Sequence, residues 1–140
     1  MNTQLPNIFI YIDFRKYLGD YYVRRKSFDR GFTHAFICRR LGYQNTKSYF
    51  YNVVKGRTDV TATFIDRFII FLELKHDEAK YFRALVNYNQ TQGPHEKDFF
   101  FDQLVRIDRT PTSNIDNIAY LFYKEWYLTF RTFKIPLLSI

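Results

Sequence analysis

THAFICRRLGYQNTKSYFYNVVKGR, which occupies residues 33–57, is the stretch that decides the fold. It holds two short runs with helical patterning, and each run stops at a glycine, Gly42 or Gly56. Glycine readily adopts the left-handed conformation that ends many helices at the C′ position. The stretch therefore predicts two short helices, over residues 33–41 and 46–55, joined by a polar turn.

The second of these predicted helices has two unlike faces. Its apolar positions are Phe50, Val53 and Val54, with Tyr49 at the border. The opposite face carries basic and hydrogen-bonding side chains, namely Lys47, Ser48, Tyr51, Asn52 and Lys55. Two short helices of which the second has such a face are typical of a helix-turn-helix, whose second helix enters the major groove of DNA.

The polar side chains of this stretch suit two kinds of contact with DNA. Lysine donates to guanine edges, asparagine pairs with adenine and hydroxyls serve either edge, so we expect base contacts from Lys47, Ser48, Tyr51, Asn52 and Lys55. We expect contacts with phosphates from side chains that flank this face, namely Arg39, Arg40, Thr46 and Arg57. An ordinary pair of packed helices with a solvated polar face fits the same pattern and stays an open alternative.

The rest of the chain also reads as helices. Apolar residues recur at helical spacing along five further segments, at residues 13–27, 61–72, 77–90, 94–107 and 115–133. Few segments alternate strictly between apolar and polar residues, so we expect little or no β-sheet. The sequence predicts an all-α fold, with a repressor-like helix-turn-helix bundle over residues 1–74 and further packed helices over 75–140. The clearest linker is RTPTSN at 109–114.

Two features of the sequence predict how the helices pack. Residues 64–72 are apolar on most sides of their predicted helix, which is typical of a helix buried from several directions. We therefore expect this helix to be the central one. Cys38 occupies a position where a small residue suits close packing between the two helices of the pair, so we expect a buried packing thiol there.

The positive charge of the chain is confined to its first half. Residues 1–70 hold 12 lysines and arginines against five acidic residues, a net charge of +7, whereas residues 71–140 hold nine of each. A basic excess on one part of a protein is what binding to phosphates requires. An anionic membrane surface would attract the same charge, and a basic surface without a binding role is a third interpretation.

The sequence disfavours several classes of protein. A single cysteine makes neither an internal disulfide nor a thiolate zinc site, and His34, His76 and His95 lack metal-ligand spacing. With only five glycines, there is no glycine-rich phosphate loop. We therefore expect no catalytic site, no metal, no cofactor and no small-molecule substrate. The chain also shows neither a signal peptide nor an apolar run long enough to span a membrane, which favours the cytoplasm.

Four stretches of the chain stand out as motifs. They are PNIFIYIDFRKYLGDYY at 6–22, SYFYNVVKGRTDVT at 48–61, FIDRFIIFLELKHDEAKYFRALVNYNQ at 64–90 and FYKEWY at 122–127. In this order they resemble the motifs of a bacterial family of helix-turn-helix transcriptional regulators. The resemblance runs over most of residues 6–131.

The resemblance implies DNA binding as a transcriptional regulator. It places the helix-turn-helix at 33–57 and the family's Lys-Gly-Arg turn at Lys55, Gly56 and Arg57, and it implies that this chain corresponds to the N-terminal part of such proteins. A helical protein-interaction or dimerisation module without DNA binding is the alternative, because the second half is rich in aromatic residues. Both ideas are compatible, since helix-turn-helix modules commonly bind as dimers, and we expect a homodimer on double-stranded DNA.

Overall fold

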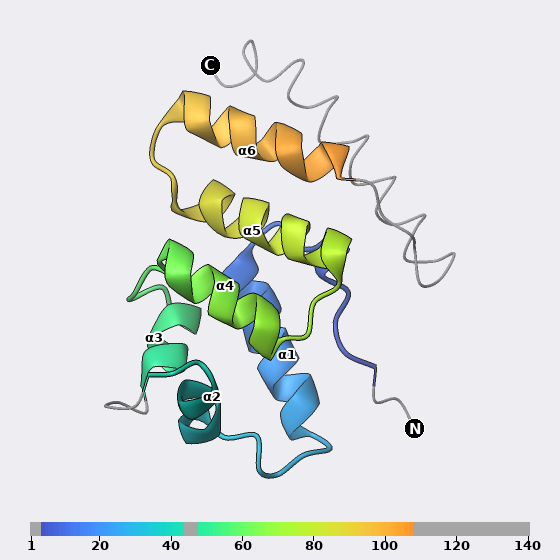
Figure 1. The fold of residues 1–140 in the computed structure, drawn as a ribbon, viewed down its shortest axis with the longest axis vertical. Helices are drawn as coiled ribbons and strands as arrows, with labels where there is room; N and C mark the ends of the chain where they lie inside the picture. Colours follow the sequence, from blue (N-terminus) through green and yellow to red (C-terminus); the bar gives the residue numbers. More distant parts are fainter. Residues whose placement is uncertain (1–3, 44–47, 108–140) are drawn as a thin grey trace, which may run out of the picture. The chain divides into compact units, whose positions relative to one another are not determined.

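The computed structural model describes residues 4–43 and 48–107, and within these ranges the chain is helical, with no strand. A short 3-10 helix, η1, precedes six α-helices (Figure 1). Their bounds are η1 (Ile8–Ile10), α1 (Phe14–Lys26), α2 (His34–Arg40), α3 (Tyr49–Val54), α4 (Ala62–Phe71), α5 (His76–Gln90) and α6 (Pro94–Arg106). The expected all-α class is confirmed for this part, whereas the predicted linker and the predicted last helix lie outside the described residues.

Several helices begin where the sequence predicts, because a side chain accepts a hydrogen bond from an otherwise unpaired N–H of the first turn. Asp13 caps α1 by accepting from the N–H of Arg15 at 2.9 Å. Thr33 caps α2 by accepting from the N–H of Phe36 at 3.1 Å. Thr61 in turn caps α4, by accepting from the N–H of residue 64 at 3.3 Å.

The two glycines of the decisive stretch end their helices as predicted. Gly42 has a φ of 86° and Gly56 a φ of 81°, so both are left-handed. At the end of α3 the N–H of Gly56 donates to the carbonyl of Val53 at 3.1 Å. The N–H of Arg57 donates to the carbonyl of Asn52 at 2.8 Å. These two bonds form a Schellman motif, which satisfies carbonyls that the end of the helix would leave unpaired.

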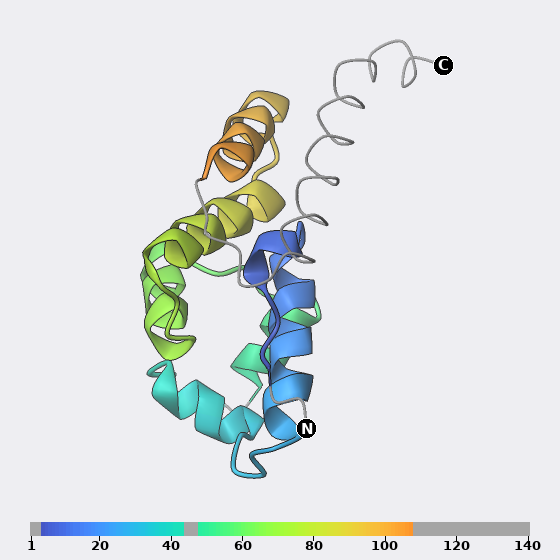
Figure 2. The ribbon, with the colours of Figure 1, turned by 90° about the vertical axis from the view of Figure 1, so that its right-hand side faces the viewer.

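The central helix is α5, not α4. It packs against η1, α1, α4 and α6, and its buried side chains are Tyr81, Phe82, Ala84, Leu85 and Val86. In Figures 1 and 2 it runs between α4 and α6, and it is antiparallel to α6. The expectation that α4 is buried from several directions is wrong, because its neighbours cover only part of its surface. Ile65 and Phe68 are buried, but Ile70 is 76% exposed.

Two amides at the end of α5 tie the N-terminal elements together. Asn89 accepts from the N–H of Phe14 at 2.7 Å through Oδ1 and donates to the carbonyl of Ile12 at 3.0 Å through Nδ2. Gln90 makes the same pair of bonds to Val60, accepting from its N–H at 2.7 Å and donating to its carbonyl at 3.0 Å. The start of α1 and the loop before α4 are therefore held by one helix end.

The described residues belong to one compact unit, which ends at Ile107. None of the described helices is long and apolar enough to cross a membrane. The division of the chain at residue 75 into a DNA-binding part and a helical extension stays a prediction.

Candidate nucleic-acid interface

The second helix of the pair is shorter than predicted. Packing connects α3 to α2 and also to α1, and α3 covers Tyr49–Val54 rather than residues 46–55. Tyr49 and Phe50 are buried and begin the helix, whereas Ser48 has a non-helical backbone (φ −103°, ψ 1°) and stands outside it. At the other end, the left-handed Gly56 stops the helix, so that Lys55 is its C-cap. Residues 46 and 47, both predicted DNA contacts, lie outside the described residues.

The inner face of α3 joins the aromatic core. Tyr49 is buried rather than at the border, because it stacks on Tyr43 with ring centroids 4.5 Å apart and meets Phe64 edge to face at 5.0 Å. Burial raises the pKa of Tyr49 to about 12, so its hydroxyl stays protonated. Phe50 and Val53 are buried beside it. This packing leaves the other face of α3 pointing outward.

The outer face of α3 gathers two cations around one exposed aromatic ring. Tyr51 is 37% exposed. Lys55 Nζ and the guanidinium carbon of Arg57 each lie 5.5 Å from the centre of its ring. Cations attract the face of an aromatic ring at such distances. The structure thus brings together two predicted base-contact residues and one predicted phosphate contact, with Ser48 exposed and Asn52 half-buried on the same short helix and its cap.

A histidine from α2 borders this group. The ring of His34 lies 5.9 Å from that of Tyr51 and 4.6 Å from that of Tyr22 on α1. Burial lowers the pKa of His34, and the nearby Lys26 adds to this effect. We call Tyr51, Lys55, Arg57 and His34 the Tyr51 cluster. His34 was not predicted from the sequence to lie in this cluster, although its position directly after the Thr33 cap indicates that it begins α2.

An arginine from α1 holds the end of α3 in place. Arg15 donates through Nη1 to the carbonyls of Val53 and Thr58, the latter at 3.0 Å, and its Nη2 pairs with Asp59 at 2.9 Å. Its guanidinium also lies over the ring of Phe14, 4.7 Å from the centre. The side chain of Arg15 is only 19% exposed. Sequence patterning gave no hint of this role, because charge and spacing do not distinguish a bracing arginine from a solvated one.

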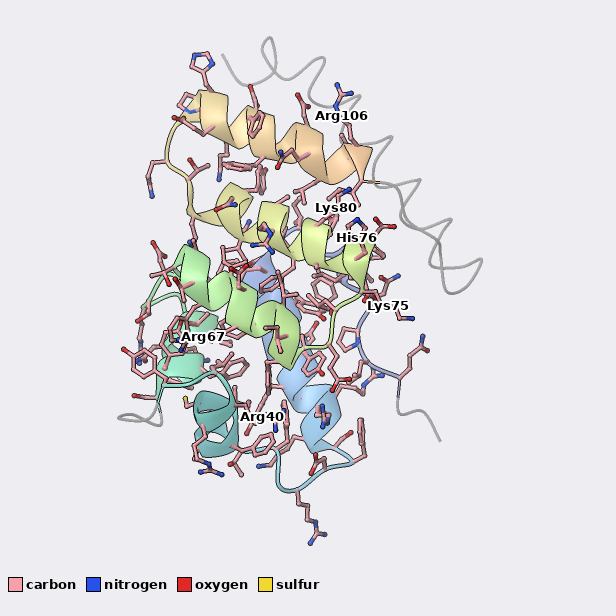
Figure 3. The ribbon with its side chains drawn as sticks, in the orientation of Figure 1. Arg40, Arg67, Lys75, His76, Lys80 and Arg106 are labelled. Atoms are coloured by element: carbon pink, nitrogen blue, oxygen red, sulfur yellow. The ribbon has the colours of Figure 1, made fainter. Side chains whose placement is uncertain are left out.

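The other predicted phosphate contacts lie at the far end of α2. Arg39 and Arg40 are exposed there. Arg40 lines a hollow of about 310 Å³ together with Arg67 of α4, and both side chains are labelled in Figure 3. Arg67 donates to the carbonyl of Leu41 at 3.0 Å and lies over the ring of Phe64. Among the described residues, the contacts of these arginines do not join them to the Tyr51 cluster.

A metal site is not apparent in the described part of the chain. No three His, Cys, Asp or Glu side chains gather there as a metal ion would need. Cys38 is buried, as expected. The chain matches no family model, no curated protein and no solved structure. The assignment of a function therefore depends on the arrangement of the residues themselves.

Proposed function

We propose that the protein binds double-stranded DNA sequence-specifically as a transcriptional regulator. In this proposal α2 and α3 form a helix-turn-helix, and the outer face of α3 enters the major groove. The observation that carries the proposal is the Tyr51 cluster, in which two cations each lie 5.5 Å from the centre of an exposed aromatic ring near the end of a braced helix. Such a surface combines phosphate neutralisation with groups that reach base edges.

The electrostatics around the cluster support an anionic partner. Asp59, which follows Arg57 closely in the chain, is paired with Arg15. That pair removes a carboxylate charge that would otherwise oppose a phosphate. An α-helix with its side chains is about 10–12 Å across, which matches a major groove about 12 Å wide.

The residues divide into the two roles expected from the sequence. Residues on the outer face of α3 and just before it contact bases, namely Lys47, Ser48, Tyr51, Asn52 and Lys55. Contacts with phosphates fall to the flanking positions Arg39, Arg40, Thr46 and Arg57. We further propose that two copies bind two half-sites, since single modules of this kind commonly act as dimers, and that the protein works in the cytoplasm.

The salt dependence of binding tests the proposal. Affinity for duplex DNA is measured at about 50 and 200 mM salt, first on random sequence and then on a selected operator. We expect a steep loss of affinity at the higher salt. Lys55→Ala should weaken binding to the selected operator, because it removes a proposed base contact together with a positive charge. Asn52→Ala should instead relax the base preference of the selected operator.

Lys16 of α1 provides a matched control. It is exposed and pairs with Asp20 of its own helix at 3.6 Å, and it contacts no member of the Tyr51 cluster, so Lys16→Ala removes one positive charge outside the cluster. We expect it to change affinity much less than Lys55→Ala does. An affinity that does not fall with salt, or equal effects of the two lysine variants, would contradict the proposal. Light scattering of the full chain with and without operator DNA tests the dimer.

A further inference from the structure

The groove between α5 and α6 is lined differently from the rest of the surface. It encloses about 390 Å³, which lies within the range of small-molecule sites. Its lining is mainly apolar near Ala84 and Ile107. Ala84 is buried, and because its side chain is a single methyl group it leaves space between the two helices.

The charge of the lining is all of one sign. Lys80, Arg83 and Arg106 line the groove, and no acidic side chain does. Arg83 is paired with Asp66 of α4. Lys80 and Arg106, in contrast, contact no carboxylate within the described part of the chain, so their charges are not neutralised there. A concave surface with charges of one sign raises the local concentration of oppositely charged ligands.

Another lysine and a histidine stand at the same end of the helix pair. Figure 3 shows Lys75, His76, Lys80 and Arg106 where α5 begins and α6 ends. The first turn of α5 also carries acidic residues, of which Glu78 accepts from the backbone N–H of Lys75 at 2.8 Å. That bond engages Glu78 at the start of α5, and neither acid of this turn lines the groove.

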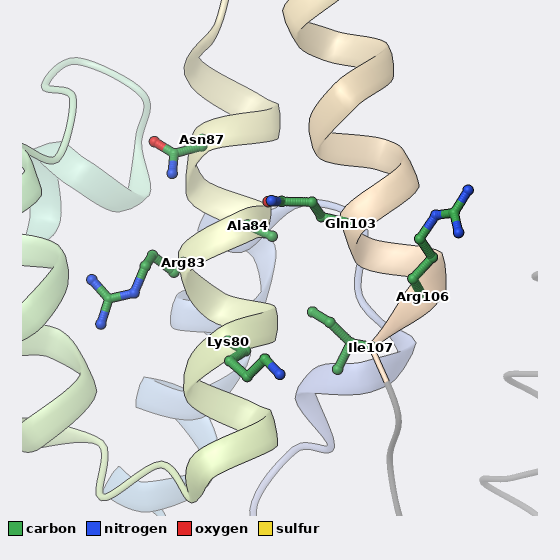
Figure 4. A pocket seen from close by; sticks show the side chains of 7 residues that line it. All are labelled: Lys80, Arg83, Ala84, Asn87, Gln103, Arg106 and Ile107. Atoms are coloured by element: carbon green, nitrogen blue, oxygen red, sulfur yellow. The ribbon is translucent and has the colours of Figure 1, made fainter.

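The side chains of the groove occupy different positions in it. In Figure 4 Lys80 and Gln103 reach into the space between the helices, and Ile107 points toward Lys80. Arg106 extends from the outer side of α6, and Arg83 extends toward the side of α4. The groove thus offers one cation and one amide inside and an apolar wall, and Arg106 lines it while its guanidinium is directed to the outer side of α6.

We propose that this groove binds a small organic anion, in which a phosphate or carboxylate group is attached to an apolar body. Lys80 and Arg106 attract the anionic group, and the amide of Gln103 donates a hydrogen bond to it. Ala84 and Ile107 contact the apolar body. The proposal does not rest on DNA binding, but in a regulator such a groove would be the site of an effector.

Calorimetric titration of the full chain tests this site with four probes: phenyl phosphate, benzoate, inorganic phosphate and benzyl alcohol. We expect saturable one-site binding of phenyl phosphate or benzoate. Inorganic phosphate lacks the apolar body and benzyl alcohol lacks the charge, so each should bind at least about fivefold more weakly, as loss of roughly 1 kcal/mol of interaction would give. The titration contains no DNA, so its result is independent of the DNA-binding proposal.

Three variants locate the bound probe. Lys80→Ala and Arg106→Ala should each weaken binding by about fivefold or more, whereas Lys16→Ala on α1 should leave it unchanged. Ala84→Leu should abolish binding by filling the groove, and its thermal melting shows whether it still folds. If Ala84→Leu does not fold, the two cation variants decide the matter alone.

Three results would overturn the proposal. The first is that no probe binds. The second is that Lys16→Ala weakens binding as much as Lys80→Ala does, which would indicate a general effect of charge. The third is that a folded Ala84→Leu protein binds the probe as the unaltered protein does.

Discussion

The C-terminal ends of α2 and α3 are built alike but held differently. Each ends in a left-handed glycine, and in each an arginine from another helix donates to a carbonyl near the end. At α3 the arginine is Arg15, which reaches two carbonyls and Asp59 and is largely buried. At α2 it is Arg67, which is exposed and donates to the carbonyl of Leu41.

This difference shows which part of the candidate interface is rigid. The brace from α1 fixes the end of α3 and the following loop, from which Lys55 and Arg57 extend toward Tyr51. At the end of α2, the bond from Arg67 to the carbonyl of Leu41 gives less support. A DNA-binding face gains affinity when its groups are held in the bound geometry beforehand. We therefore expect Arg15 to act on DNA binding through the position of α3, without touching DNA.

The largest expected effect comes from removing each arginine in turn. Arg15→Ala takes the arginine donor from the carbonyl of Thr58, one of two donors from the carbonyl of Val53 and the partner from Asp59, and it should lower the free energy of unfolding by about 2–3 kcal/mol. Arg67→Ala removes one bond at an exposed site and should cost about 0.5–1 kcal/mol. Urea denaturation at pH 7 measures both. Equal losses would show that the two ends are held with the same strength.

A charge-preserving change separates the brace from simple electrostatics. Arg15→Lys keeps the positive charge but cannot reach two carbonyls and a carboxylate with a planar fork of donors. We expect it to lose most of the stability that Arg15→Ala loses. In DNA binding, Arg15→Lys should lower affinity while leaving the salt slope unchanged, since no phosphate contact is removed. A reduced slope would instead place Arg15 on the DNA.

The two glycines give the next effect in size. Either one changed to Ala forces a side chain into the left-handed region, which costs about 1–2 kcal/mol. At Gly56 a Cβ meets only Arg15 Cδ, at 4.0 Å, whereas at Gly42 it would lie 2.6 Å from Arg67 Nη1. Gly42→Ala should therefore also displace Arg67 and be the more destabilising of the two. In an Arg67→Ala background the two glycine variants should lower the free energy of unfolding by the same amount. A persisting difference between them would refute this account.

The C-terminal end of α4 extends the comparison, and there we expect a smaller change, a gain in the free energy of unfolding. After α4 the left-handed position is held by Glu73, with a φ of 55°, instead of a glycine. The end of α4 makes the same two Schellman bonds as the end of α3. The N–H of Glu73 donates to the carbonyl of Ile70 at 3.1 Å, and the N–H of Leu74 donates to the carbonyl of Ile69 at 3.2 Å. Glu73→Gly relieves the strain and should raise the free energy of unfolding by about 0.5–1 kcal/mol. A loss of stability in the urea midpoint would contradict this.

The smallest expected effect concerns pH at the start of α2. The pKa of His34 is lowered in the folded protein, so the unfolded chain binds its proton more readily. The stability that His34 contributes is therefore complete above its ordinary pKa near 6.5 and declines as the pH falls through its lowered value. His34→Gln should reduce the loss of stability between pH 7.5 and pH 5. Identical urea midpoints for both proteins at both pH values would show that His34 does not contribute.

The sequence predicted the local features of the fold well. Thr33 and the two glycines act as caps and stops because their effects depend on the chain within a few residues. The sequence-based prediction was wrong where packing between helices decides the start of a helix or its place in the fold. Ser48 has a hydrogen-bonding side chain and was predicted within a helix, but the buried pair Tyr49 and Phe50 fixes the start of α3. The six apolar residues of α4 did not make it central, because no pattern within a helix shows how many neighbours cover it.

The candidate site divides in the same way. Tyr51, Lys55 and Arg57 were identified from the sequence, because residues four apart on a helix and in the turn directly after it lie near one another. Arg15 and His34 were not identified from the sequence, because they belong to α1 and α2. Their positions near α3 depend on contacts between residues far apart in the chain.

What the sequence by itself determined is the helical class of the described residues, the caps and glycine stops of several helices, and the confinement of positive charge to the first half. These follow from local backbone preferences and composition. The tertiary structure alone decided which arginines brace the helix pair and which stay exposed, and that α5 is the central helix. All arginines carry the same charge and donors, so only the carbonyls and rings that packing brings within reach give each one its role.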